Sequence, residues 1–253
     1  MKILSVNVGL PREVRWQGKL VTTGIFKEPI EGQVMLQTLN LDGDRQADLT
    51  VHGGVNKAVY DYPSEHYSYW RTELPGVDLL WGMFGENFTT EGLLEETVYI
   101  GDRFRIGDAE VIVTEPRMPC YKLGIKFGRA DMIKRFLASR HTGFYFAVVR
   151  GGMVGAGDAI ELIRREQQEI SVADITRLYA FEKNDLSGLR QAIGVEWLPD
   201  NWKGYFQHQL VEADRLTSSR PSPSRGRSQS HVGSSAIVPD ENEVPQRPGP
   251  LSQ

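Results

Sequence analysis

Short apolar runs separated by glycine dominate the first two thirds of the chain, and they restrict the folds that it can adopt. The runs have the length and alternation of β-strands. The expected strands are Ile3–Val8, Gly32–Leu39, Ala58–Tyr62, Phe144–Val149 and Asp158–Ile163. A hairpin is expected over Arg103–Glu115, because Gly107-Asp108 separates two alternating runs. Many short strands with glycine turns favour a mainly β domain with a closed or nearly closed β-barrel over a doubly wound sheet.

Helical periodicity is rare before residue 164 and dominates after it. Within the first part we predict a helix over Ser64–Leu74, with Ser64 as its N-cap, and another over Arg129–Ala138. Three short helices follow, beginning after Ser171, Asp185 and Asp200, with Asp174 completing a cap and Gly194 ending the second helix. Such a unit buries little by itself, so we expect it to pack on the barrel. The predicted domains are a barrel at 1–164, a three-helix unit at 165–214 and a disordered tail at 215–253.

Charge and hydropathy exclude several classes of partner. The net charge of −4 and pI of about 5.8 do not suggest a nucleic-acid polymer as partner. The sequence has no apolar run long enough to cross a membrane, and its start lacks the pattern of a signal peptide. We therefore expect a cytoplasmic protein with no membrane partner.

The chain has one cysteine, Cys120. A lone cysteine excludes an internal disulfide, a zinc site built from several thiolates and an iron–sulfur cluster. Arg117 and Lys122 flank it, and two cations near the sulfur would favour the thiolate that binds metals. The alternative is an inert buried cysteine, which spacing alone favours because free cysteine is often buried.

Three further clusters contain residue types suited to ligand binding. His52, Gly53, Gly54 and Lys57 combine a permissive backbone with positive charge, which suits a phosphate; the alternative is a plain glycine turn. Glu86 is a candidate acid or base and the adjacent Asn87 a candidate partner for a heterocycle edge, unless they only form a turn. Arg140 precedes an expected buried strand, where a helix-ending turn is the alternative.

Taken in order, these motifs resemble the MOSC domain, named for the C-terminal part of molybdenum cofactor sulfurases. The similarity is to its YiiM-like branch, which carries a C-terminal three-helix domain and is linked to resistance against 6-hydroxylaminopurine. The matching segments are 43–48 (GDRQAD), 52–60 (HGGVNKAVY), 85–87 (GEN) with Gly92, 100–102 (IGD) and 116–123 (PRMPCYKL).

The resemblance implies a β-barrel akin to the pyruvate kinase insert barrel, and a molybdenum cofactor (Mo-molybdopterin) whose metal is bound by the catalytic residue Cys120. By the same analogy, a set of glycines and cationic side chains is expected to bind the cofactor phosphate. Asn87 and Arg140 are expected to contact the edge of the pterin or of the substrate. The phosphate set is His52, Gly53, Gly54, Lys57, Arg117 and Lys122. Pyridoxal phosphate binding is also associated with the family, but no residue of this chain supports it.

The function implied by the resemblance is reduction of N-hydroxylated small molecules, such as N-hydroxylaminopurines. Since the chain has neither an iron–sulfur cysteine set nor a flavin fingerprint, a separate reductase protein is expected as electron donor. Two alternatives stay open: a sulfur carrier with a persulfide on Cys120, and a module that holds the cofactor without turnover. The sequence leaves the oligomeric state open.

Overall fold

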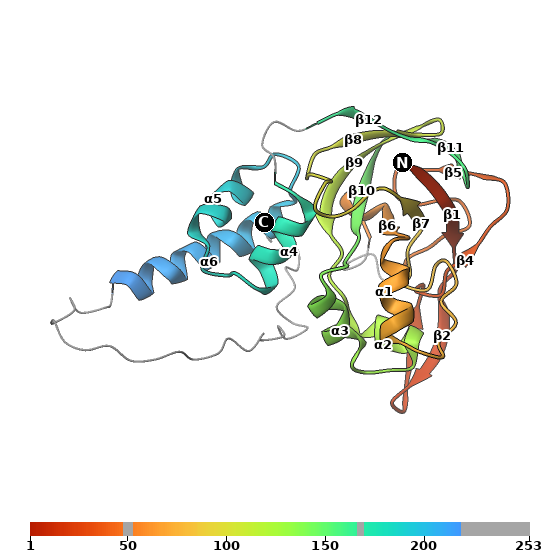
Figure 1. Ribbon diagram of the computed structural model, residues 1–253, viewed down its shortest axis with the longest axis horizontal. Coiled ribbons are helices and arrows are strands. Elements are labelled where there is room, and N and C mark those ends of the chain that lie inside the picture. Colours follow the sequence, from red (N-terminus) through yellow and green to blue (C-terminus); the bar gives the residue numbers. More distant parts are fainter. Residues whose placement is uncertain (48–52, 166–169, 219–253) are drawn as a thin grey trace, which may run out of the picture.

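The computed structural model describes residues 1–47, 53–165 and 170–218, and Figure 1 shows a curled sheet beside a small group of helices. Strands dominate the first part and helices the second, which confirms the predicted mainly β class with a C-terminal three-helix unit. Within the described residues, no helix has the length and apolar character needed to cross a membrane.

The main sheet has the strand order β12-β8-β9-β10-β6-β7-β1-β4, and its neighbours are antiparallel except for the parallel pair β6 and β7. Its strands are β1 (Lys2–Val8), β4 (Glu28–Pro29), β6 (Val59–Pro63), β7 (Phe88–Glu91), β8 (Arg103–Ile106), β9 (Ala109–Pro116), β10 (Phe144–Arg150) and β12 (Ile160–Arg164). The hairpin expected around Gly107 is the β8–β9 pair.

The β12 end of this sheet returns to β1, the neighbour of the terminal strand β4. Lys2 forms an isolated antiparallel bridge with Ala159. The Ile160 N–H donates to the Met1 carbonyl at 2.9 Å, and the Ile3 N–H to the Asp158 carbonyl at 3.0 Å. Strand twist curls the sheet, and pairing its ends removes unsatisfied edge groups. The result is a nearly closed barrel, in which a short bridge replaces a full ladder between β12 and β1.

The remaining strands form two smaller, two-stranded sheets. One pairs β5 (Gln33–Leu36) with β11 (Gly152–Gly155), and the other is the hairpin of β2 (Arg12–Trp16) and β3 (Lys19–Thr23), which projects from one end of the barrel in Figure 1. This hairpin was not predicted, because its strands are mostly polar and exposed. The Gln17-Gly18 pair between the two strands was a usable signal in the sequence. Both residues have positive φ, as tight hairpin turns require, and glycine adopts such angles readily.

Short helices pack against one side of the barrel: η1 (Val55–Lys57), α1 (His66–Glu73), α2 (Tyr121–Phe127) and α3 (Met132–Ser139). Helices α1 and α3 were expected, whereas α2 was not. The predicted N-cap of α1 is wrong, because Glu65 occupies that position and makes no side-chain cap bond. Ser64 instead accepts the Tyr67 N–H through its carbonyl, at 3.0 Å.

The helical unit contains α4 (Val172–Ala180), α5 (Leu186–Gly194) and α6 (Asp200–Ser218). Ser171 and Asp174 form the expected capping box, and the Asp185 side chain accepts the Gly188 N–H. Gly194, expected just beyond α5, is its last residue. Helix α6 continues past residue 215, where the predicted tail begins, and the rest of that tail lies outside the described residues.

The helical unit packs on the barrel as expected. A single hydrophobic core runs from strand residues such as Val113 to helical residues such as Leu178 and Phe206. The backbone joins the two parts as well, because the Ile100 N–H donates to the Ile170 carbonyl and the Val172 N–H to the Val98 carbonyl, each at 3.0 Å.

Candidate active site

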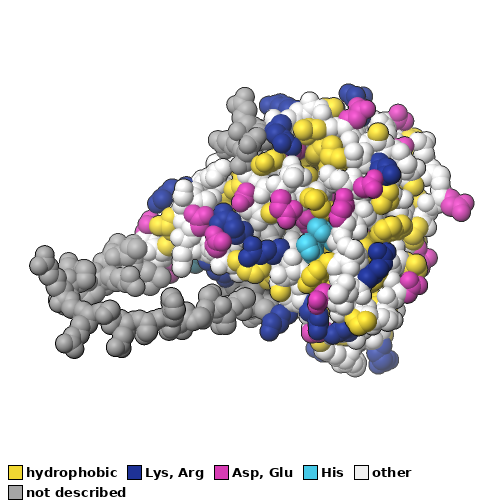
Figure 2. Space-filling model, in the orientation of Figure 1, with side chains coloured by type: hydrophobic (Ala, Val, Ile, Leu, Met, Phe, Trp, Pro, Cys, Tyr) yellow, Lys and Arg dark blue, Asp and Glu magenta, His cyan; other side chains and the backbone are white. Residues whose placement is uncertain are grey.

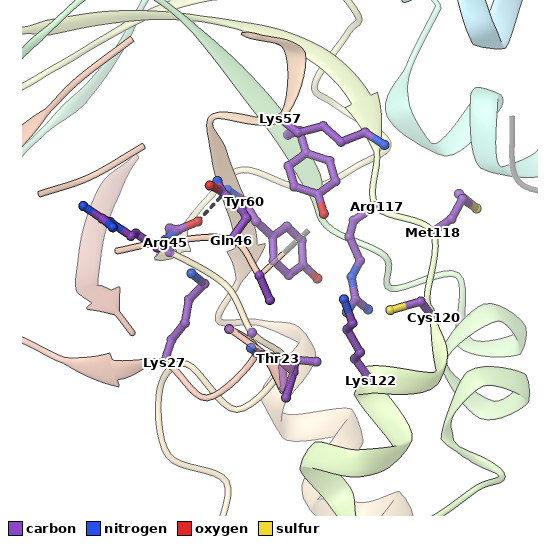
Figure 3. A pocket seen from close by; sticks show the side chains of 16 residues that line it. Thr23, Lys27, Arg45, Gln46, Lys57, Tyr60, Arg117, Met118, Cys120 and Lys122 are labelled. Atoms are coloured by element: carbon purple, nitrogen blue, oxygen red, sulfur yellow. Dashed lines mark hydrogen bonds between the residues drawn. The ribbon is translucent and has the colours of Figure 1, made fainter. Parts of the chain in front are cut away.

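A pocket of about 640 Å³, part of it open to solvent, lies where β6 and the segment after β9 face the chain around residues 23–27 and 45–47 (Figure 3). The pocket brings together a thiol, Cys120, two tyrosines, Tyr60 and Tyr145, and several cationic side chains.

The charge of the pocket wall is of one sign. Among the residues that the structure describes, five cationic residues line the pocket and no Asp or Glu lines it. The cationic residues are Lys27, Arg45, Lys57, Arg117 and Lys122. Elsewhere, on the face in Figure 2, acidic and basic side chains are interspersed. Since the whole chain has a net charge of −4, the positive charge in the pocket is a local concentration that favours an anionic ligand.

Cys120 is a free, half-buried cysteine immediately before α2. Its backbone is extended, with φ −123° and ψ 171°, and its carbonyl accepts the Leu123 N–H at 2.9 Å. Figure 3 shows the sulfur directed toward the side chains of Arg117 and Lys122. The two flanking cations therefore approach the thiol in space as well as in sequence.

Arg117 is buried, yet its hydrogen bonding is incomplete. Its guanidinium lies over the rings of Tyr60 and Phe136, at 5.2 and 5.1 Å from their centroids. Within the described residues its Nη1 atom is buried without a hydrogen-bond partner. A buried donor left unsatisfied is costly, and the Arg117 side chain that carries this nitrogen lines the pocket.

Lys27 and Arg45 are pocket residues that our sequence analysis did not select. Buried Lys27 forms an ion pair with Asp44, and burial lowers the pKa of Lys27 although Asp44 opposes the shift. Arg45 lies at the exposed rim. The family motif at 43–48 contains both Asp44 and Arg45, so it was the signal that could have placed this wall in the site.

Lys57, Asn87, Arg117, Cys120 and Lys122, all selected from the sequence, line the pocket. For Asn87 the contacts indicate a bracing role. Its Oδ1 accepts the Tyr60 N–H at 3.1 Å, and its Nδ2 donates to Asp44 Oδ2 at 2.9 Å. The amide thus joins two walls of the pocket, and these bonds occupy it.

Among the described residues, Gly53, Gly54 and Arg140 do not line the pocket. The prediction for His52 lies outside the described residues, and Gly53 and Gly54 directly precede η1, which contains Lys57. Arg140 ends α3, and its guanidinium stacks on Phe181 of the helical unit at 4.3 Å, so the structure does not bring it to the pocket.

Glu86 braces a loop near the pocket and does not face the ligand space. Its carboxylate accepts the N–H groups of Gly82 and Phe84, at 2.8 and 3.0 Å, and the Tyr67 hydroxyl. Burial raises its pKa, and these hydrogen bonds oppose the shift. The carboxyl group is therefore occupied in holding the loop before β7.

No group of three or more His, Cys, Asp or Glu side chains that could hold a metal ion occurs in the described part of the chain. Cys120 would thus be a single protein ligand, and a metal in this pocket needs further donors from an organic ligand. A soft cysteine sulfur beside cations fits a metal carried by an anionic dithiolene cofactor.

A nearly closed β-barrel with a thiol and a cationic pocket defines this chain as a MOSC-domain protein. The MOSC domain model matches residues 48–161, and the model of the YiiM-like 3-alpha helix domain matches residues 170–212. The chain belongs to the MOSC family, and within it to the YiiM-like branch.

Relatives in other organisms support this assignment. YflK of Bacillus subtilis (strain 168) is 41% identical over 214 residues, covering 85% of this chain and 95% of that protein. YiiM of Escherichia coli (strain K12) is 36% identical over 200 residues, covering 78% and 80%. The crystal structure of YiiM from Geobacillus stearothermophilus superposes with a TM-score of 0.70 at 33% identity, covering 83% of this chain and 98% of that one.

A more distant relative is named "Reductase". This protein of Gibberella moniliformis (strain M3125 / FGSC 7600) is 33% identical over 179 residues, which cover 70% of this chain and 32% of the relative. Most of the fungal protein therefore lies outside the shared region.

Proposed function

We propose that this protein is a molybdenum-cofactor-dependent oxidoreductase that reduces N-hydroxylated small molecules, with N-hydroxylaminopurines as the model substrate class. The observation that carries the proposal is the pocket itself: the sulfur of Cys120 faces it beside buried Arg117, whose Nη1 atom has no partner in the described chain. Family membership and the name of the fungal relative support the same class of reaction.

In this proposal the chain contributes binding and orientation. Cys120 is the protein ligand to molybdenum, and Arg117, Lys122 and Lys57 hold the anionic parts of the cofactor. Lys27 and Arg45 extend this positive wall on the opposite side of the pocket (Figure 3). His52 stays a predicted member of the phosphate site, whereas Gly53 and Gly54 lie outside the pocket lining and hold Lys57 at its edge only through η1.

When bound, the cofactor supplies the two electrons with which an N–OH group and two protons become an N–H group and water. The chain can hold protons close to this chemistry. Tyr145 lines the pocket, and burial raises its pKa to about 12, against the opposing charge of Arg117. Its hydroxyl is therefore protonated at neutral pH and is able to donate to a substrate oxygen.

Electrons would come from a separate reductase protein. One cysteine cannot bind an iron–sulfur cluster, so the chain has no such relay of its own. We propose a cytoplasmic setting, where a lone thiol stays reduced.

Elemental analysis of gently purified protein tests the proposal. We expect stoichiometric molybdenum in the wild type and its loss in Cys120→Ala, together with loss of activity on 6-hydroxylaminopurine in the presence of a reductase. Molybdenum at the same level in both proteins, or turnover with pyridine nucleotide and no added protein, would contradict it. A persulfide mass shift on Cys120 without molybdenum would instead support the sulfur carrier, and bound cofactor without turnover the binding module.

A further inference from the structure

Two cationic side chains meet on one aromatic ring beside the pocket. The Arg12 guanidinium lies over the ring of Phe26, 3.7 Å from its centroid, and the Lys126 Nζ lies 5.1 Å from the same centroid. Arg12 is exposed, whereas Phe26 and Lys126 are half-buried. We call these three residues the Phe26 cluster. Contact with a ring holds the two charges in place without neutralising them.

Two members of the Phe26 cluster are immediate neighbours of residues that line the pocket. Arg12, in β2, stands opposite Thr23 in the β2–β3 register, and Phe26 directly precedes Lys27. Thr23 and Lys27 both line the pocket, and Figure 3 shows them on the side of the view opposite Lys57. The hairpin and the chain that leaves it therefore bring the cluster to this end of the pocket.

Helix α2 connects the third member to the same pocket. Lys126 lies one helical turn after Lys122, which lines the pocket, and side chains four residues apart share one face of a helix. Along the helix axis, Lys126 is about 9 Å from Cys120, the N-cap residue. A ligand that reaches both the thiol and the cluster is therefore elongated, with its anionic group at the end away from the thiol.

The charge of the cluster is not neutralised by the protein around it. Among the described residues, neither Arg12 nor Lys126 forms an ion pair or hydrogen bond with a carboxylate. Burial lowers the pKa of Lys126, and the cations Arg12 and Lys27 add to that shift, whereas Glu86 and Glu28 oppose it. Two like charges held on one ring repel each other, and an anion bound to both removes that repulsion.

A phosphate ester is the anion that suits this pair of donors. A guanidinium offers a rigid fork of N–H groups and an ammonium a compact charge, and both bind phosphate oxygens. In the proposed function the cofactor is bound by other side chains, namely Cys120, Arg117, Lys122 and Lys57. The cluster is then available to a second anionic group. A free purine base has no such group, whereas a purine nucleotide carries a phosphate that the ribose separates from the base.

We infer that the Phe26 cluster binds the phosphate of the substrate, so that N-hydroxylated purine nucleotides bind more tightly than the corresponding free bases. Arg12 and Lys126 donate to the phosphate, Phe26 positions both cations, and the base occupies the pocket. This inference rests on the proposed function for the N-hydroxylated part of the substrate.

Calorimetric titration of the full-length protein, purified with its cofactor, tests the inference with adenosine 5′-monophosphate and adenosine as probes. Neither probe has an N–OH group, so binding is measured without turnover. We expect the wild type to bind the monophosphate at least about tenfold more tightly than adenosine. Arg12→Gln and Lys126→Gln should each weaken monophosphate binding about 3- to 10-fold and leave adenosine binding unchanged. Equal affinity of the wild type for the two probes would overturn the inference.

Two variants serve as controls. Arg15→Gln removes a charge from the opposite face of the same strand, so it should bind the monophosphate like the wild type. A loss equal to that in Arg12→Gln would mean a general effect of charge and would overturn the inference. Lys126→Arg keeps the charge and should keep most of the affinity, and a loss as large as in Lys126→Gln would mean a packing role and overturn it. If Lys126→Gln does not fold, exposed Arg12 still decides.

Molybdenum content separates the substrate from the cofactor as the source of the phosphate. We expect Arg12→Gln and Lys126→Gln to contain as much molybdenum as the wild type. Loss of the metal from both would place the cofactor phosphate at the cluster and overturn the inference. A wild type without molybdenum that binds the monophosphate through the cluster would refute the proposed function and leave the phosphate site standing.

Discussion

Arg117→Met separates a ligand-binding role of this buried cation from a structural one. The substitution keeps a long apolar side chain against Tyr60 and Phe136 but removes the guanidinium. It also removes the buried Nη1 atom that has no partner in the described residues. We expect the free protein to change little in stability and the loaded protein to lose its cofactor.

The magnitudes follow from the contacts. Removing an unsatisfied buried donor gains about 1–3 kcal/mol, and losing two cation–π contacts costs about 0.5–2 kcal/mol each, so the free energy of unfolding should change by only about 1 kcal/mol. For a chain of this size that is a shift of roughly 2–4 °C in melting temperature. Losing a charge-assisted hydrogen bond to the ligand costs about 1.5–3 kcal/mol, or about 10- to 150-fold in affinity.

The assay pairs thermal melting of the cofactor-free protein with molybdenum measured during dialysis by plasma mass spectrometry. Arg140→Met is the matched control: its guanidinium packs on Phe181 away from the pocket, so we expect a lower melting temperature and unchanged molybdenum retention. If Arg117→Met melted well below the wild type and still retained molybdenum normally, the reasoning about the unsatisfied nitrogen would be refuted.

Three further predictions concern the fold. Ser171→Ala removes the capping box of α4 and should lower the free energy of unfolding in urea by about 1 kcal/mol, whereas no change would contradict the capping argument. Gly143 has φ 60°, and an added Cβ would lie 2.3 Å from the Asp61 carbonyl, so Gly143→Ala should lower the melting temperature markedly; a wild-type melting curve would contradict this geometry. Burial raises the pKa of Asp61 well above 3.8, so the folded state binds the proton more tightly than the unfolded state, and stability falls as pH rises above that value. Asp61→Asn should therefore stabilise the protein more at pH 8 than at pH 4 in urea unfolding, and an equal effect at both values would exclude the neutral acid.

Local patterns were enough for much of the architecture. The β8–β9 hairpin, β1, β6, β10 and the helices of the C-terminal unit follow from alternation, helical spacing and capping residues, because each signal acts within a few neighbours. The hairpin β2–β3 and helix α2 were missed, since polar strands and a short helix after Pro119 lack a strong hydrophobic period.

By itself, the sequence determined the fold class, the family and the presence of one thiol flanked by cations. Only the tertiary structure decided which cations meet that thiol. Lys27 and Cys120 are far apart along the chain and line the same pocket, whereas Arg140 faces the helical unit. Arg12 and Lys126 come from separate elements and meet on the ring of Phe26. The physical reason is that a buried charge takes its role from whichever partner the packing places within hydrogen-bond distance, and chain order does not encode that partner.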